Sequence, residues 1–96
     1  MNINNEWCLI VRSFYAKQIP SMERFVLFAG TIAKITGRYT GGRRLSVYSR
    51  KGNRFSFLVE EKNFKKYCQG IQTKNRINVD LKEFSVTTNA KLYSFV

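Results

Sequence analysis

Basic side chains and tyrosines are interleaved through the middle of the sequence. Between Lys34 and Arg54 the chain carries seven Lys and Arg residues and no Asp or Glu. Arginine forks match the geometry of phosphate oxygens, and tyrosine rings offer flat faces on which bases stack. This combination favours binding of a single nucleic-acid strand. The candidate contact residues are Lys34, Arg38, Tyr39, Arg43, Arg44, Tyr48, Arg50, Lys51 and Arg54.

Two kinds of contact are expected within this set. The arginines are expected to bind phosphates: Arg38, Arg43, Arg44, Arg50 and Arg54. Tyr48 is the first candidate for base stacking, and Tyr39 is the second. An alternative role of Tyr48 is to cover an edge of the folded sheet.

The charge of the whole chain points to the same ligand class. Its 96 residues contain 17 Lys and Arg but six Asp and Glu, which gives a net charge of +11 and a pI near 10.1. Such a potential attracts polyanions, of which nucleic acid is the commonest in a cell. The length predicts one domain.

Catalytic and metal-binding residue types are scarce. The chain has no histidine, and Asp80 is its single aspartate. Glu60 and Glu61 are adjacent, so at least one of them points away from any shared site. Cys8 and Cys68 lie far apart in apolar contexts, which predicts two reduced, buried thiols. We therefore expect no enzyme activity, no cofactor and no metal.

Targeting signals are also missing from the sequence. No stretch approaches the ~18 consecutive apolar residues of a membrane helix. The first residues lack the basic region of a secretion signal. The expected location is cytoplasmic, without membrane contact.

Hydrophobic patterning predicts an all-β chain with one short helix, and the resemblance described below implies that its strands form a barrel. Strands are recognised by alternating apolar and polar residues, and the helix by apolar residues three and four apart. Gly30 lies inside one expected strand and marks a bend there. The expected strands are 7–15, 24–36, 44–50, 54–60, 76–82 and 92–96, the helix is 61–70, the mobile glycine-rich loop is 37–43, and turns fall at 51–53 and 87–90.

Alternation also assigns side chains to two faces of the 44–60 hairpin. Leu45, Val47, Phe55, Phe57 and Val59 are expected to point into the core. The opposite face should carry Arg44, Ser46, Tyr48, Arg50, Arg54, Ser56 and Glu60.

The order of long bent strand, hairpin, helix, strand and strand resembles the oligonucleotide/oligosaccharide-binding (OB) fold, a five-stranded Greek-key barrel. The helix at 61–69 lies where that family joins its third and fourth strands. The resemblance covers residues 24–96 and leaves 7–15 as an extra N-terminal strand. It implies a ligand surface on the 44–50 and 54–60 strands, flanked by the loops at 37–43 and 87–90.

The resemblance implies a single-stranded DNA-binding protein of replication, recombination or mobile-element maintenance. One alternative is an RNA-binding OB domain of translation, which would use the same groove. Another is a protein-interaction module that docks on an acidic partner. Because an exposed apolar strand invites association, residues 7–15 further predict a homo-oligomer, either a dimer or a tetramer.

Overall fold

The computed structural model describes residues 4–49, 51–73 and 91–95. Within these ranges the chain forms eight strands and one short helix, so the predicted all-β class with a single short helix is confirmed. The elements are β1 (Asn4–Ile10), β2 (Phe14–Ile19), β3 (Arg24–Leu27), β4 (Ile32–Tyr39), β5 (Gly42–Tyr48), β6 (Arg54–Glu60), α1 (Glu61–Tyr67), β7 (Cys68–Thr73) and β8 (Lys91–Ser94).

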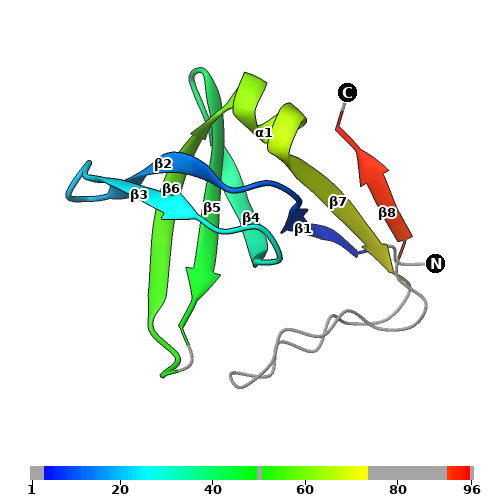
Figure 1. The fold of residues 1–96 in the computed structure, drawn as a ribbon, viewed down its shortest axis with the longest axis horizontal. Helices are drawn as coiled ribbons and strands as arrows, with labels where there is room; N and C mark the ends of the chain where they lie inside the picture. Colours follow the sequence, from blue (N-terminus) through cyan, green and yellow to red (C-terminus); the bar gives the residue numbers. More distant parts are fainter. Residues whose placement is uncertain (1–3, 50, 74–90, 96) are drawn as a thin grey trace.

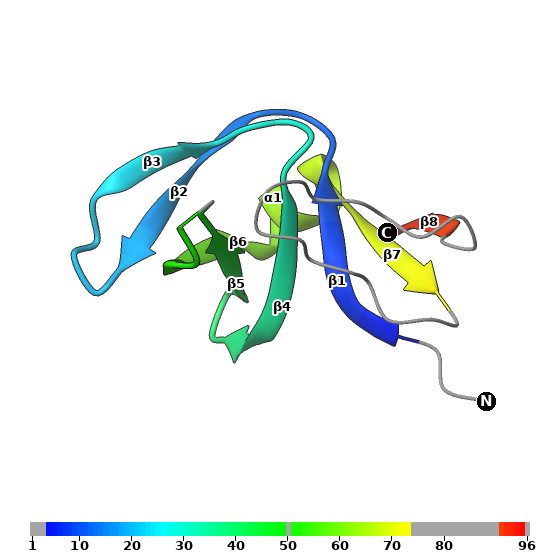
Figure 2. The ribbon, with the colours of Figure 1, turned by 90° about the horizontal axis from the view of Figure 1, so that it is seen from below.

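All the described strands belong to one antiparallel sheet, with the order β3-β2-β6-β5-β4-β1-β7-β8 (Figure 1). In a flat sheet β1 and β2 would stand four strand spacings apart, about 19 Å. Residues 11–13, which connect them, span about 14 Å even when fully extended. The sheet therefore curls into a barrel-like shape, and Figure 2 shows β1 running over its top into β2.

The N-terminal segment differs from its prediction. The single strand expected over 7–15 is two strands, broken at residues 11–13. Neither is an appendage: β1 lies between β4 and β7, and β2 lies between β3 and β6. Both strands have partners on each side, so this segment offers no unpaired strand edge. The argument for a homo-oligomer, which depended on such an edge, therefore no longer applies to it.

The segment around Gly30 also differs. The expected strand over 24–36 is divided into β3 and β4, and Gly30 lies in the connection, where its φ of 93° suits glycine. The expected loop over 37–43 is instead a tight hairpin, because β4 reaches Tyr39 and β5 begins at Gly42. The register of β4 with β5 shifts between Ile35 and Gly37, which marks a β-bulge in β4.

The helix begins where the sequence predicts and ends early. It stops at Tyr67 rather than at residue 70, and β7 follows at once. Gly70 is therefore a strand residue, with the Tyr93 ring packed where a side chain would lie. The expected strand 76–82 and the turn 87–90 lie outside the described residues. The OB resemblance uses both segments and stays a prediction.

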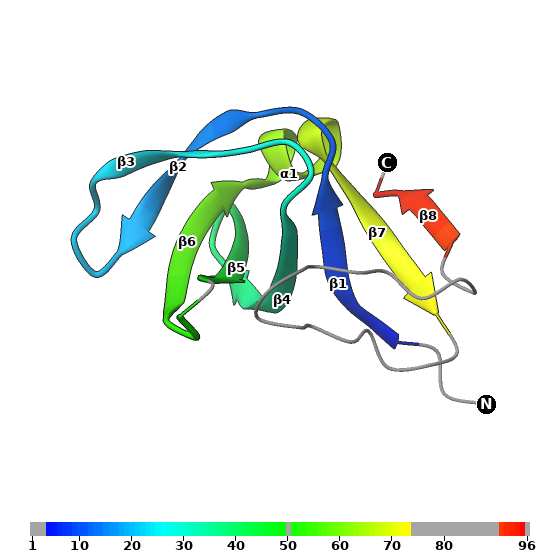
Figure 3. The same cartoon turned by 60° about the horizontal axis from the view of Figure 1, so that its bottom comes forward.

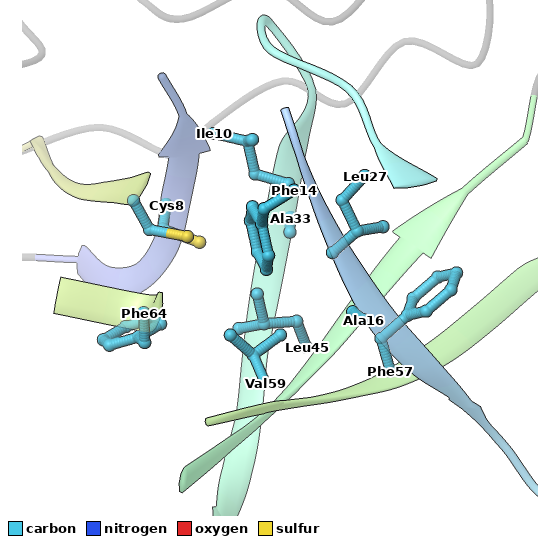
Figure 4. Packing of buried hydrophobic residues seen from close by; sticks show 11 residues of the cluster. Cys8, Ile10, Phe14, Ala16, Leu27, Ala33, Leu45, Phe57, Val59 and Phe64 are labelled. Carbon is cyan, nitrogen blue, oxygen red and sulfur yellow. The ribbon is translucent and has the colours of Figure 1, made fainter. Parts of the chain in front are cut away.

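The main core lies inside the curl of the sheet; Figure 3 shows the curl of the backbone, and Figure 4 shows the packed side chains. Leu45, Phe57 and Val59 are buried as predicted, whereas Phe55 at the start of β6 is 39% exposed. Phe64 projects from α1 and is fully buried against the Phe95 ring, with centroids 4.2 Å apart. The whole cluster comprises Cys8, Ile10, Phe14, Ala16, Leu27, Ala33, Leu45, Phe57, Val59, Phe64 and Cys68.

Both cysteines are free and buried, as the sequence predicts. A hydrogen bond with Cys68 and burial raise the pKa of the Cys8 thiol. The Cys8 thiol is thus a neutral core group. In the part of the chain that the structure describes, no helix has the length and apolar character needed to cross a membrane.

Candidate nucleic-acid interface

Strand register defines the side of the sheet opposite the main core. This side is open over part of its area, because Ser46 is buried and Ile32 packs with Ile71, Trp7 and Leu9 in a second, smaller apolar cluster. Residues directly across from each other on paired strands point to the same face. Leu45 pairs with Phe57 on the core side, so their neighbours point outward. We call the outward side of β2–β6 the outer face, and its charged and tyrosine residues are Tyr15, Lys17, Arg24, Lys34, Tyr39, Arg44, Tyr48, Arg54 and Glu60.

The cations of the outer face lie in rows across the strands. One row runs from Arg44 through Leu58 and Lys17 to Arg24. A second row contains Lys34 opposite Ser46, which in turn pairs with Ser56. A third pairs Tyr48 with Arg54. Among the described residues of these strands, Glu60 is the single carboxylate on this side, so the face is strongly positive.

Tyrosine rings lie among these cations. Tyr15 is 60% exposed, and the Arg24 guanidinium carbon lies 5.4 Å from its ring centroid. Tyr48 is half-buried beside Arg54. Where a ring lies beside a cation, one nucleotide can stack its base on the ring while its phosphate contacts the cation.

Tyr39 is fixed by a close approach to Gly42. The two residues are paired, and a Cβ on Gly42 would lie 2.8 Å from the Tyr39 hydroxyl oxygen. The ring therefore lies across Gly42 towards Glu60, which pairs with Gly42 from the other side. Burial raises the pKa of Tyr39, and the charge of Glu60 raises it further. The hydroxyl keeps its proton at neutral pH and is available as a donor.

A cavity of about 390 Å³ opens at this end of the outer face. It lies between the β2–β3 hairpin, the end of β6 and the start of α1, because β2 and β6 pair only over residues 17–19 and 56–58. Its lining combines aromatic, cationic and hydrogen-bonding groups. The lining residues are Tyr15, Ala16, Lys17, Met22, Arg24, Tyr39, Leu58, Glu60 and Asn63.

Arg43 points away from the outer face. It pairs with Val59 on the core side, where its guanidinium lies over the Phe64 ring at 4.9 Å. Its Nε and Nη2 donate to the two carboxylate oxygens of Glu61 at 3.1 and 3.3 Å. This bidentate pair lowers the pKa of Glu61. Arg43 thus joins β5 to α1.

The other expected contact residues are spread over several places. Arg38 is exposed, pairs with Arg43 at the hairpin end and helps to lower the pKa of Glu61. Lys51 is exposed in the turn between β5 and β6. Arg50 lies outside the described residues. The structure therefore brings together Lys34, Tyr39, Arg44, Tyr48 and Arg54 from the predicted set.

Sequence reasoning missed that β2 and β3 contribute to the outer face and that α1 contributes to the cavity. Tyr15 lies in the expected strand that the OB resemblance leaves outside the barrel, Lys17 lies between two expected strands, and Arg24 begins the expected strand 24–36. A local signal was present, since Tyr15 and Lys17 alternate with the buried Phe14 and Ala16. Nothing in the sequence placed these residues beside β6.

Comparison with known proteins finds no matching protein family, no matching curated protein and no matching solved structure. Among the residues that the structure describes, no three His, Cys, Asp or Glu side chains come together as a metal ion would require.

Proposed function

We propose that this chain binds single-stranded nucleic acid along the outer face, with DNA favoured over RNA. The observation that carries the proposal is the strand register, which brings Lys17, Arg24, Lys34, Arg44 and Arg54 onto one side of the sheet with three tyrosines. The cations would follow the phosphates and the rings would stack on bases. Replication, recombination or mobile-element maintenance in the cytoplasm is the expected setting.

A single strand fits this surface better than a duplex does. Stacking on tyrosine requires a base whose flat face is free, and bases inside a duplex are already stacked on each other. Readers of the major groove usually insert a helix. The helix of the described residues is α1, which has seven residues and packs Phe64 into the core.

Salt dependence of affinity tests the electrostatic part of the proposal. For wild type, the logarithm of affinity for oligothymidylate should fall linearly with the logarithm of salt concentration. The Arg44→Ala, Arg54→Ala double variant should flatten that slope by about 0.7 for each phosphate that the variant no longer neutralises. The matched control is Lys65→Ala, Lys66→Ala, which removes the same charge from the exposed side of α1. Equal slopes for the two double variants would contradict the placement of the binding surface.

Tyr48→Ala tests the stacking part with the same titration. Loss of one base–aromatic stack should weaken binding by about 1–3 kcal/mol and leave the slope near that of wild type. Tyr48→Phe, which keeps a ring, should bind like wild type. If both variants bind like wild type, Tyr48 only covers the sheet.

Competition between DNA and RNA strands of equal length and sequence decides the nucleic-acid type. A preference for DNA supports the proposal as stated, whereas a preference for RNA would require contacts to the 2′-hydroxyl. If neither strand is retained at moderate salt, nucleic-acid binding is excluded and docking on an acidic protein becomes the better explanation of the charge.

A further inference from the structure

The cavity at the end of the outer face differs chemically from the rest of that surface. The outer face elsewhere offers cations and rings, which hold a strand without regard to its bases. The cavity also contains Glu60, and a carboxylate there repels phosphates. A carboxylate beside a bound nucleic-acid strand therefore needs a hydrogen-bond donor rather than a phosphate as its partner. In nucleic acid, the N–H donors lie on the edges of the bases.

The size and walls of the cavity fit one base. Its volume of about 390 Å³ lies at the small end of ligand pockets, which range over about 300–1,000 Å³. Tyr15 and Tyr39 approach it from β2 and β4, so aromatic rings are available for stacking. Lys17 and Arg24 belong to the same lining and would hold the phosphates on either side of the inserted nucleotide.

Other hydrogen-bonding groups line the same cavity as Glu60. The Tyr39 ring lies across Gly42 towards it, and Asn63 of α1 adds an amide NH2 group as donor and a carbonyl oxygen as acceptor. The described ion-pair partner of Glu60 is Lys62, at 3.8 Å, and both side chains are more than half exposed. Such an exposed pair contributes little, so the carboxylate can exchange this partner for a ligand.

We propose that this cavity accepts one unpaired base of the bound strand and that Glu60 makes it select guanine. The proposal rests on the proposed function and extends it from holding a strand to reading one of its bases. Guanine presents two adjacent donors, N1–H and the 2-amino group, and the two oxygens of a carboxylate accept both. Thymine presents one N–H between two carbonyl oxygens, and those oxygens are repelled by a carboxylate that approaches the N–H.

Fluorescence anisotropy with labelled single strands tests this selectivity. Wild type should bind an oligothymidylate with one central guanine about tenfold more tightly than plain oligothymidylate, as for a good bidentate contact to a base. Hypoxanthine in place of guanine lacks the 2-amino group and should give an intermediate affinity. In Glu60→Gln the preference for guanine should disappear, because the amide offers one acceptor instead of two.

The matched control is Glu23→Gln, which makes the same charge change on the β2–β3 turn, outside the cavity lining. It should strengthen binding to every strand slightly and keep the guanine preference. Equal affinities of wild type for the guanine and thymine strands, or a preference that survives in Glu60→Gln, would overturn the base-reading role. Failure of wild type to bind any strand would instead refute the proposed function.

Discussion

Arg43 and Arg44 are neighbours in the sequence and face opposite sides of the sheet. Because successive residues of a strand alternate, only one of them can share a face with Tyr48. Arg44 is exposed on the outer face, whereas the Arg43 side chain is 16% exposed and bound to Glu61. Counting charges along a sequence therefore overestimates a binding surface when it ignores the alternation of the strand that carries them.

The ion pair of Arg43 and Glu61 makes stability depend on pH in the acid range. Arg43 lowers the folded-state pKa of Glu61 below its usual value of 4.5. The pair therefore stabilises the fold above that value, and the contribution is lost as pH falls through the lowered folded pKa. We expect the free energy of unfolding of Glu61→Gln to fall less below pH 4.5 than that of wild type. The effect should be small, because Glu61 is 37% exposed.

Urea titrations at a series of pH values measure this difference. Glu23→Gln is the control, since Glu23 is exposed and has no described ion pair. It should keep the acid dependence of wild type. Parallel curves for wild type and Glu61→Gln would show that the pair contributes nothing to stability.

At the scale of elements, the β4–β5 hairpin depends on the absence of a side chain at Gly42. A Cβ there would collide with the backbone carbonyl oxygen of Val59 and approach the Tyr39 hydroxyl to 2.8 Å. Gly42→Ala should thus destabilise the protein by about 1–3 kcal/mol, the usual cost of overpacking. Chemical unfolding at neutral pH measures the change.

Gly37 provides the control on the same hairpin. It lies in β4, and a Cβ added there would have no neighbouring atom within 4 Å, so Gly37→Ala should change stability by less than about 0.5 kcal/mol. If Gly42→Ala is equally neutral, the packing of Tyr39 over Gly42 does not constrain the hairpin.

Local elements were predictable where the sequence carries local signals. The strand over 54–60 has the bounds of β6, and 44–50 overlaps most of β5, because alternation and the turn at 51–53 define both. The break between β1 and β2 has no comparable signal, since Val11, Arg12 and Ser13 include neither glycine nor proline. Pairing of β2 with β6 joins residues about 40 apart, and no local pattern specifies such a partner.

At the scale of the molecule, α1 covers the end of the core with one large side chain. Phe64 is fully buried and contacts the Phe95 ring and the Arg43 guanidinium. Phe64→Ala should cost about 3–5 kcal/mol of unfolding free energy. Because such a loss approaches the total stability of a small domain, thermal unfolding by circular dichroism is the suitable measurement.

Phe28→Ala is the comparison for that variant. Phe28 is 67% exposed, so its removal should shift the unfolding midpoint little. Similar shifts for the two variants would mean that Phe64 is not the central packing residue of this end of the core.

The junction between β2 and β6 is short. It has three residue pairs, compared with seven between β5 and β6. A nucleic-acid strand that contacts both Lys17 and Arg44 would cross the β2–β6 junction. Its contacts would add to the few backbone hydrogen bonds there and hold the two strands together. Bound nucleic acid would then protect the amides of β2 from hydrogen exchange. Local opening of the β2–β3 hairpin would in turn allow the ligand to dissociate.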